Sequence, residues 1–448
     1  MCFDNNPNNS SGEELIFIES NENLTLANKM RAIRKTLGWT QLQLATEMGY
    51  SSTTIDNYEH TRYRVTDEVL RKFRQATGTE GVPLKNDEIV AYKKDIYSRN
   101  YSLNHNDKKQ VNELLHMLAK CAKFSFDTDL QILCNLLSAI YYFTMNNKKE
   151  CDRIIDSLST REHEFTDEHY YWYYRCLGLI QYTLRRYKSA LALYLKAEEH
   201  GKRVNPDLNI NIRSLYYNIG LCFTFMNYPI QANEYFEKLH SNELDSHTVL
   251  YGFNIQRFLA INASMLGQTQ KALKKLENCI NYAISEKKIS ETRFAATYLD
   301  IGIVYQDAGN FEKALENFAI ASSYFDKKSE VYLEYMCHKA VLLRSYNRDE
   351  VLELVNKGLS MATKGTLWYE WLDAVKHSKE LDNQASLMYL ECTLIPRLLE
   401  YGKHLLVMNC YEWISDHSKK AMCYKPALKY SEKAKKIFSQ LMKGDLSL

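Results

Sequence analysis

Small and polar side chains gather at helical spacing near the start of the chain, where they could form hydrogen bonds with another molecule. The residues on this predicted outer face are Ser52, Thr53, Asp56 and Asn57. Each can donate or accept a hydrogen bond, and a helix that presents such a face can enter the major groove of DNA. The sequence therefore predicts a helix that contacts the edges of bases.

Two short helices joined by a tight turn are expected to position this face. Thr40 can cap the first helix, and Gly49 can supply the positive φ that the turn requires. Ser51 or Ser52 can cap the second helix. The residues expected to be buried between the two helices are Leu42, Leu44, Ala45, Met48, Ile55 and Tyr58. This arrangement is a helix-turn-helix.

The composition indicates a folded chain with more than one part. A length of 448 residues exceeds one compact core, and six prolines favour long uninterrupted helices. The net charge of +2 does not identify a partner, but residues 26–74 hold nine Lys and Arg against five Asp and Glu. A basic segment on a nearly neutral chain fits a nucleic-acid-binding head, although an ordinary solvated surface would have the same balance.

The cysteines and the apolar runs indicate a cytoplasmic protein with no membrane partner. The eleven cysteines include no C-x-x-C pair, which favours buried free thiols in a reducing cytosol. Those expected inside apolar helical patterns are Cys176, Cys222, Cys279, Cys337 and Cys392. Residues 1–23 are polar rather than signal-like, and no run of about 18 apolar residues could span a bilayer.

A helical repeat occupies most of the chain. Its anchors are small residues at intervals of 42, 40 and 42, namely Gly178, Gly220, Ala260 and Gly302. A second small residue follows twelve positions later, and usually an aromatic residue four positions after that, as in Ala232 and Phe236. This pattern lets two antiparallel helices pack closely, and it resembles the tetratricopeptide repeat, although the usual period is about 34.

These patterns predict an all-α chain: an N-terminal helix-turn-helix domain followed by an α-solenoid of tetratricopeptide-like helix pairs. Residues 1–23 are expected to be flexible, and residues 24–80 to form the helix-turn-helix domain. Residues 81–107 are expected to be a linker with a connecting helix, and residues 108–448 a repeat domain for peptide binding and dimerisation. Within it, 109–160 and 333–362 are interpreted as degenerate repeats and 411–438 as the last one.

A solenoid curves, so the first helix of each pair is expected to line a concave surface. The polar residues predicted on this surface are Arg213, Asn218, Asn254, Arg257, Asn262 and Asp300. Asparagine can pair with a peptide backbone through both its donor and its acceptor, and arginine can clamp a carboxylate. For any one of them, facing solvent or capping a turn is an equally good interpretation.

No pattern of catalytic or cofactor-binding residues stands out. The sequence has no phosphate-binding loop, dinucleotide fingerprint, H-E-x-x-H or G-x-S-x-G, so we expect neither an enzyme nor a cofactor. His163, Glu164 and His169 have the wrong spacing for a metal site on one helical face, and a polar loop is preferred. The aromatic run 170–174 could be a stacking platform, but tight packing at the start of a repeat helix is favoured.

Residues 26–76 resemble the Cro/repressor-like (XRE) helix-turn-helix family. The matching residues are Thr40, Gln41, Leu44, Ala45, Gly49, Ile55 and Glu59. The resemblance implies that Gln41 contacts the DNA backbone and that Glu59 pairs with Arg34. It further implies that Ser52, Thr53 and Asn57 contact bases. Arg62 and Arg64, in the following loop, are expected to contact phosphates. One departure is His60-Thr61, where many members have glycine.

An XRE head joined to a long tetratricopeptide body resembles the RRNPP group of peptide-pheromone receptors. That resemblance implies a quorum-sensing transcription regulator that binds an inverted-repeat operator in double-stranded DNA as a homodimer. A short signalling peptide in the repeat groove would change how the two heads sit on DNA, through the connecting helix at 87–98. Two alternatives stay open: a body that sequesters or dephosphorylates a response-regulator partner, and a repressor with no peptide ligand.

Overall fold

The computed structural model describes residues 25–102, 108–206, 212–239, 248–285, 289–344 and 348–443. The predicted flexible segment 1–23 lies outside these residues. The described chain is helical and contains no strand, so the predicted all-α class with a repeat body is confirmed. It divides into two compact units, one from the described residues of Met1–Cys176 and Glu199–Asn211, the other from those of Leu177–Glu198 and Ile212–Leu448.

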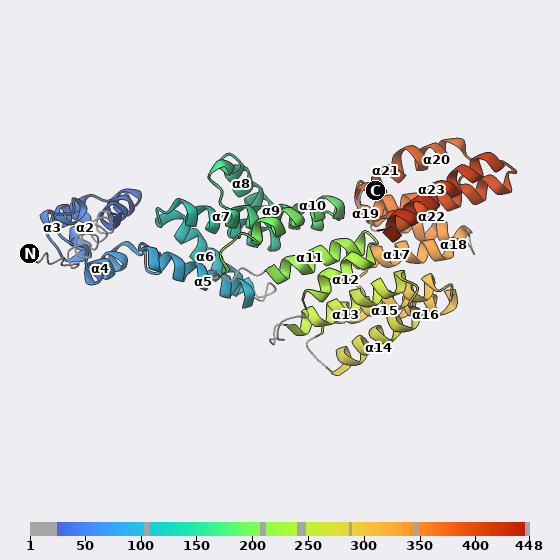
Figure 1. Ribbon diagram of the computed structural model, residues 1–448, viewed down its shortest axis with the longest axis horizontal. Coiled ribbons are helices and arrows are strands. Elements are labelled where there is room, and N and C mark those ends of the chain that lie inside the picture. Colours follow the sequence, from blue (N-terminus) through green and yellow to red (C-terminus); the bar gives the residue numbers. More distant parts are fainter. Residues whose placement is uncertain are drawn as a thin grey trace, which may run out of the picture. The chain divides into compact units, whose positions relative to one another are not determined.

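The first unit starts with the predicted head (Figure 1). A helix over residues 25–36 is followed by α2 (Gln41–Met48), α3 (Ser52–Glu59) and α4 (Asp67–Thr77). The helices that come next are α5 (Asn86–Ser102), α6 (Lys108–Phe124), α7 (Thr128–Thr144) and α8 (Lys148–Ser159). Helices α9 (Asp167–Thr183) and α10 (Tyr187–Gly201) supply residues to both units.

The turn and caps of the head are as predicted, with one error in its core. Thr40 caps α2, Ser51 caps α3, and Gly49 has a φ of 70° at the turn. Leu44, Ala45 and Met48 are buried, but Leu42 is 65% exposed, so its predicted burial was wrong. Since successive helical residues are 100° apart, Leu42 points about 160° away from Leu44 and cannot share its face.

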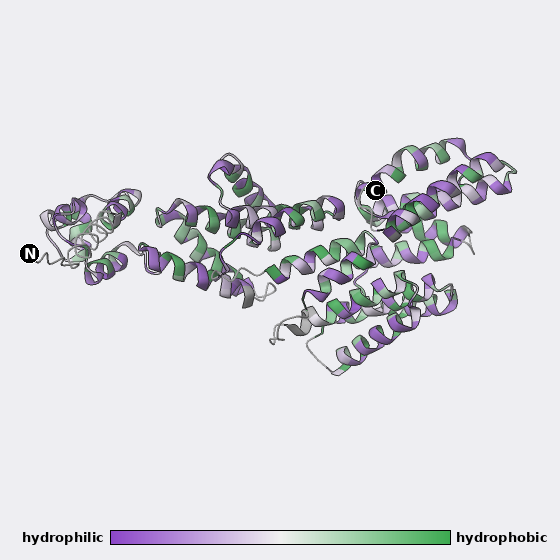
Figure 2. Cartoon of the chain, in the orientation of Figure 1, coloured by the Kyte–Doolittle hydropathy of each residue, from purple (hydrophilic) through white to green (hydrophobic). Residues whose placement is uncertain are grey.

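The second unit consists mainly of antiparallel helix pairs. They are α11 (Ile212–Phe225) with α12 (Pro229–Glu237), α13 (Thr248–Met265) with α14 (Thr269–Ser285), α15 (Glu291–Asp307) with α16 (Phe311–Tyr324), and α17 (Glu330–Leu343) with α18 (Arg348–Met361). Then come α19 (Leu367–Ser378), α20 (Gln384–Tyr389) and α21 (Ile395–Glu400), followed by the last pair, α22 (His404–Lys420) and α23 (Tyr424–Lys443). Apolar stripes alternate with polar ones along these helices (Figure 2). No described helix is long and apolar enough to cross a membrane.

The repeat anchors explain why the paired helices pack so closely. A Cβ atom added to Gly178 would lie 2.5 Å from Tyr194, and one added to Gly220 would lie 2.6 Å from Phe236. Each aromatic ring therefore lies directly on the backbone of the preceding helix. In the pair of α13 and α14 the equivalent positions hold Ala260 and Leu276, which are buried in one cluster, so a larger anchor faces a smaller partner.

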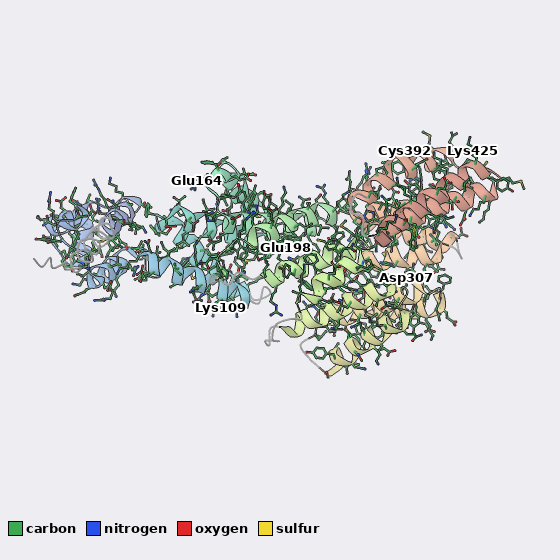
Figure 3. The ribbon with its side chains drawn as sticks, viewed as in Figure 1. Lys109, Glu164, Glu198, Asp307, Cys392 and Lys425 are labelled. Carbon is green, nitrogen blue, oxygen red and sulfur yellow. The ribbon has the colours of Figure 1, made fainter. Side chains whose placement is uncertain are left out.

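The cysteines follow the predicted burial with one exception. Cys176, Cys222, Cys279 and Cys337 are buried free thiols. Cys392 is exposed, so its predicted burial was wrong (Figure 3). It lies in a π-helical turn, Leu390–Leu394, that joins α20 to α21. The wider turn rotates the following residues away from the positions that a regular helical period assigns to them.

Residues from the two ends of the second unit meet, which the repeat pattern did not predict. The segment between α21 and α22 reaches the helices at the start of this unit. A Cβ atom on Gly402 would lie 2.7 Å from Met226, and the His404 ring packs edge-on against Tyr228 with centroids 5.8 Å apart. The repeat array of this unit is thus closed by the turn before α22, which we call the closing turn (Tyr401–His404).

Candidate functional site

The N-terminal end of α3 presents the residues predicted to contact bases. The Ser51 hydroxyl accepts a hydrogen bond from the backbone N–H of Thr54 at 3.1 Å, which fixes the start of the helix. Ser52 and Thr53 are exposed on its first turn, and Asn57 is half-buried one turn later. Short polar side chains on an exposed helix start are suited to hydrogen bonds in a groove.

A buried ion pair holds α3 against the first helix. Glu59 accepts two hydrogen bonds from Arg34, at 2.6 Å to Nε and 2.9 Å to Nη2, and the pairing expected from the XRE resemblance is confirmed. The hydrogen bond to Glu59 raises the pKa of the Arg34 guanidinium. Arg34 also donates to the carbonyl oxygen of Trp39 at 2.7 Å, so one side chain connects the first helix, the α2 entry and α3.

Gln41 lies inside this link rather than on the surface of α2. Its amide nitrogen donates to Asp56 at 3.2 Å and to Glu59 at 3.0 Å. The hydrogen bond from Gln41 is the main cause that lowers the pKa of the Asp56 carboxyl. Both amide protons are therefore used within the head, and a phosphate, which only accepts hydrogen bonds, would have to displace a carboxylate to reach them.

The loop after α3 folds back onto the same face. Arg62 donates from Nη1 to Asp56 at 3.0 Å and to the side-chain oxygen of Asn57 at 3.2 Å. The amide nitrogen of Asn57 has no acceptor among the described residues, so it is available as a donor. Arg64 is exposed in the same loop. Thr61, at the departure from the family pattern, has a φ of 59°, so the backbone keeps the left-handed conformation that glycine usually supplies.

On the repeat body, one predicted pair of ligand-binding residues is paired internally. Arg257 on α13 and Asp300 on α15 form an ion pair at 2.7 Å, and both are almost fully buried. Burial raises the pKa of Asp300 to about 6, although Arg257 opposes that shift. Ser264 donates to Asp307 at 3.3 Å further along the same two helices. Helices α13 and α15, the first helices of neighbouring pairs, are therefore joined by polar contacts at two positions along their length.

The other predicted groove residues have different surroundings. Asn262 is fully buried and donates to Asn233 of α12 at 2.9 Å, and Arg213 donates to the carbonyl oxygen of Leu239 at 2.7 Å. Asn218 and Asn254 are half-buried, and their side chains have no hydrogen-bond partner among the described residues. Of the predicted set, these two amides are the ones left free to bind another backbone.

Sequence reasoning missed a cluster at the closing turn. Lys403 lies between 5.4 and 5.6 Å from the ring centroids of Tyr187, Phe225 and Trp371. Burial lowers the pKa of Lys403 to about 8. Arg185 pairs with Glu330 at 2.8 Å beside it. These residues come from helices up to about two hundred positions apart, so no local pattern could group them.

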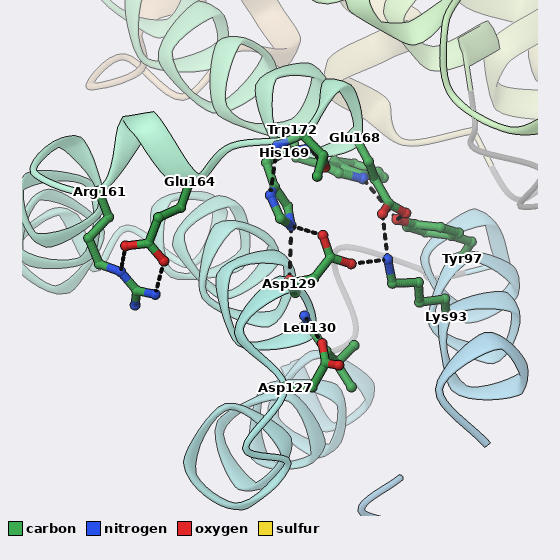
Figure 4. A network of polar contacts seen from close by, with 11 residues as sticks. Lys93, Tyr97, Asp127, Asp129, Leu130, Arg161, Glu164, Glu168, His169 and Trp172 are labelled. Carbon is green, nitrogen blue, oxygen red and sulfur yellow. Dashed lines mark hydrogen bonds and ion pairs between the residues drawn. The ribbon is translucent and has the colours of Figure 1, made fainter. Parts of the chain in front are cut away.

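A buried network in the first unit anchors α5, the helix that follows the head (Figure 4). Lys93 of α5 donates to Asp129 of α7 and to Glu168 of α9, at 2.6 Å in each case. The Tyr97 hydroxyl also donates to Glu168, and its ring stacks on Trp172 at 5.6 Å. On the head side, Glu88 of α5 pairs with Arg74 of α4 and caps its own helix at the N–H groups of Leu84 and Lys85.

The histidine and aromatic run before the first repeat belong to this packing. His169 accepts from the Thr166 backbone N–H at 3.2 Å, and its other nitrogen lies 2.8 Å from the Asp129 carbonyl oxygen. Burial lowers the pKa of His169. Tyr171, Trp172 and Tyr173 are buried, so the preferred interpretation of the aromatic run as packing is confirmed. The described residues hold no cluster of three or more His, Cys, Asp or Glu side chains arranged for a metal.

These features define a helix-turn-helix head followed by an all-helical repeat body. Residues 30–83 match the helix-turn-helix family model. The response regulator aspartate phosphatase A of Bacillus subtilis (strain 168) is 22% identical over 223 residues, which is 48% of this chain and 56% of the relative's length. The match thus spans about half of that relative.

Solved structures share the fold. NprR in complex with its cognate peptide NprX has a TM-score of 0.65 at 20% identity, with 79% of this chain and 98% of that chain covered. A Rap protein complexed with Competence and Sporulation Factor has a TM-score of 0.64 at 13% identity, covering 80% and 99%. The family model confirms the predicted helix-turn-helix head, and the solved structures confirm the predicted all-helical repeat body at the level of fold.

Proposed function

We propose that this chain is a cytoplasmic transcription regulator that binds operator DNA as a dimer and is switched by a short peptide bound in its repeat body. The observation that carries the proposal is the exposed start of α3, with Ser52, Thr53 and Asn57 on a rigidly held helix. The NprR relative, which shares the fold, was solved with a cognate peptide, and this supports the ligand class.

In this proposal each polar residue of the head has a defined task. Ser52, Thr53 and the free amide nitrogen of Asn57 contact base edges, while Arg62 and Arg64 contact phosphates. Gln41 acts by holding Asp56 and Glu59, so it positions α3 and reaches the DNA backbone only if those contacts open. Two heads of a dimer must place their α3 helices about 34 Å apart, or a multiple of this, on an inverted repeat.

The peptide is proposed to lie against the first helices of the repeats. Asn218 and Asn254 bind its backbone, because a peptide that leaves water needs partners for its N–H and C=O groups. Arg257 and Asp300 compensate each other, so together they present a closed ion pair rather than a free clamp. Arg213 and Asn262 support the helices that carry the ligand contacts.

Helix α5 is proposed to carry the signal between body and head. It is tied to α4 through Glu88 and to α7 and α9 through Lys93. Because α9 continues into the second unit, a change of pitch in the repeats can shift its first turns. That shift would move α5 and with it the head.

A selection from random duplex DNA tests the DNA half of the proposal. The wild-type chain is expected to enrich an inverted repeat, and light scattering is expected to give twice the chain mass of 52.4 kDa. The enriched duplex then serves as probe while a synthetic random-peptide library is screened for peptides that change its binding. Failure to enrich any sequence would rule out operator recognition.

The peptide half is tested by calorimetry with a peptide from that screen. Asn218→Ala and Asn254→Ala should each cost roughly 1–3 kcal/mol of peptide affinity, because a desolvated partner loses its hydrogen bond. Asn317→Ala on α16, whose amide binds its own helix, is the matched control. Unchanged affinity in both groove variants would place the peptide elsewhere.

A second candidate function is favoured by the curated relative, which is a response regulator aspartate phosphatase. The body would then sequester or dephosphorylate a response regulator. The test incubates the chain with phosphorylated receiver domains and follows both binding and loss of phosphate, with and without peptide. Binding or phosphate loss would support this candidate, and neither activity would argue against it.

A further inference from the structure

Helix α23, the last helix among the described residues, carries an exposed apolar stripe that the repeat fold does not use. Helix α23 buries Ala427, Ala434 and Ile437 against the rest of the unit. On a different face, Tyr424 is 70% exposed, Leu428 62% and Phe438 51%. A helix face that meets water is ordinarily polar, so this stripe is unexpected.

The spacing of the stripe is that of a helix-packing seam. Tyr424, Leu428, Ser431, Lys435 and Phe438 follow one another at intervals of four, three, four and three residues. This alternation keeps side chains on one line of a helix that packs lengthwise against another helix. Ser431 at the middle is small, which permits close approach, and the long Lys435 stem can lie along an apolar partner.

Lysines line one side of the seam. The helix contains six lysines and a single acidic residue, Glu432. Lys433 is already paired with Glu391 at 2.8 Å, on the packed side of the helix. Lys425, which is labelled in Figure 3, is exposed, as are Lys429 and Lys436, and these three lysines form no ion pair with the described residues. A partner that packs on the seam would therefore meet an edge of net positive charge, since Glu432, which lies three residues after Lys429 and four before Lys436, offsets only part of it.

We propose that the seam of α23 is a docking site for an acidic amphipathic helix of a partner protein. The apolar positions would supply the contact area, and the flanking lysines would select for glutamate or aspartate beside it. The same charges disfavour a second copy of α23, because two such helices would bring like charges together. The stripe is only one residue wide and is interrupted by Lys435, so it offers little area for insertion into a lipid surface.

The proposal is independent of the peptide groove and of DNA binding, since α23 carries no residue assigned to either. It is tested on the full chain with a labelled acidic heptad peptide that has leucine at a and d and glutamate at the flanks. Two control peptides replace the leucines by serine or the glutamates by lysine. Fluorescence anisotropy is expected to detect binding of the first peptide and at least about tenfold weaker binding of either control.

Variants of the chain distinguish specific binding at the seam from unspecific attraction between opposite charges. L428S/F438S and K425E/K429E/K436E should each weaken binding of the acidic peptide about tenfold or more. K271E/K274E/K327E changes the charge equally at exposed lysines elsewhere in the same unit and should leave binding unchanged. Circular dichroism and thermal unfolding check that each variant remains folded.

Several outcomes would overturn the proposal. Binding of the serine control as tight as that of the leucine peptide, or equal loss in the control triple variant, would mean unspecific attraction of charge. Loss of the dimer mass in L428S/F438S would identify the seam as a contact between copies. Binding of phosphatidylglycerol vesicles without binding of the acidic peptide would identify a lipid surface instead.

Discussion

Thr61 occupies the left-handed region of backbone conformation in the turn that follows α3. Backbone hydrogen bonds hold it there, since its N–H donates to the Tyr58 carbonyl oxygen at 3.1 Å and the Arg62 N–H donates to the Asn57 carbonyl oxygen at 2.8 Å. A β-branched side chain in this region costs roughly 1–2 kcal/mol. The head therefore keeps its turn at an energetic cost, and the turn aims Arg62 at the recognition face.

Replacing Thr61 by glycine should stabilise the head. The relief of strain exceeds the extra chain entropy that glycine adds to the unfolded state, so we expect a gain of about 0.5–1 kcal/mol. Hydrogen exchange of the amides of α3 measures it. Thr46→Gly, at an exposed helical position, is the control and should lose stability. Faster exchange in Thr61→Gly would mean that its side chain contributes more than its backbone costs.

Asn57 and Arg62 should separate base reading from phosphate contact. Asn57→Ala should cost about 1–3 kcal/mol on the selected duplex and little on random DNA, because a base-edge hydrogen bond is lost. Arg62→Ala should weaken both duplexes and flatten the dependence on salt concentration. Band-shift titrations over a range of salt concentrations measure both effects. Equal losses of Asn57→Ala on both duplexes would contradict the base-reading role.

At the scale of single residues, the sequence predicted the features that depend on residues nearby in the chain or on a known family pattern. The caps at Thr40 and Ser51, the φ of Gly49 and the pairing of Glu59 with Arg34 follow from local spacing or family pattern. The partners of Gln41 could not be predicted in the same way, because they depend on which carboxylates α3 turns toward it. A helical wheel of α2 would have found both the exposure of Leu42 and the inward direction of Gln41.

At the scale of helix pairs, the size of the anchor residue and the size of its partner vary in opposite directions: glycine faces an aromatic ring, and alanine faces leucine. A Cβ atom added to Gly220 would lie only 2.6 Å from the Phe236 ring, while the next pair has Ala260 with Leu276. The sequence predicted these pairs because both members lie within one repeat. It could not predict the polar contacts between neighbouring first helices, such as Arg257 with Asp300, since these depend on how one repeat is rotated on the next.

The exchange can be tested by a double-mutant cycle at Gly220. Gly220→Ala alone should cost roughly 1–3 kcal/mol, because the added methyl collides with the Phe236 ring. Phe236→Leu alone leaves a cavity and should also destabilise. The double variant recreates the combination found at Ala260 and Leu276, so its loss should be smaller than the sum. Urea unfolding gives the three values, and strict additivity would contradict the packing argument.

At the scale of the whole second unit, its closure makes stability depend on pH. His404 is fully buried, and neither ring nitrogen has a partner among the described residues. Burial lowers the pKa of His404 to about 4, against an ordinary value of 6.5. A lowered pKa means that the stabilisation is complete above pH 6.5 and is lost as pH falls toward 4, by up to about 3 kcal/mol.

Comparison of the wild-type chain with His404→Phe isolates this effect. The phenylalanine side chain cannot be protonated, so the stability of the variant should fall less than that of the wild-type chain between pH 6.5 and 4. Burial lowers the pKa of His338, which acts in the same direction, and raises the pKa values of Asp300 and Asp307, which acts against it, but these three groups are present in both chains. Parallel pH profiles in urea unfolding would show that His404 is not the group responsible.

The closing turn also restricts how the chain can change its length. In an open solenoid a helix pair can be gained or lost with little consequence for the others, because each pair touches only its neighbours. Here Lys403 must meet Tyr187 and Phe225, and Arg185 must meet Glu330. Removing one helix pair between these residues would move the closing turn and α17 away from Tyr187, Phe225 and Arg185, so these contacts would be lost. The number of pairs in this unit is therefore fixed by geometry, and viable insertions should fall in the loops.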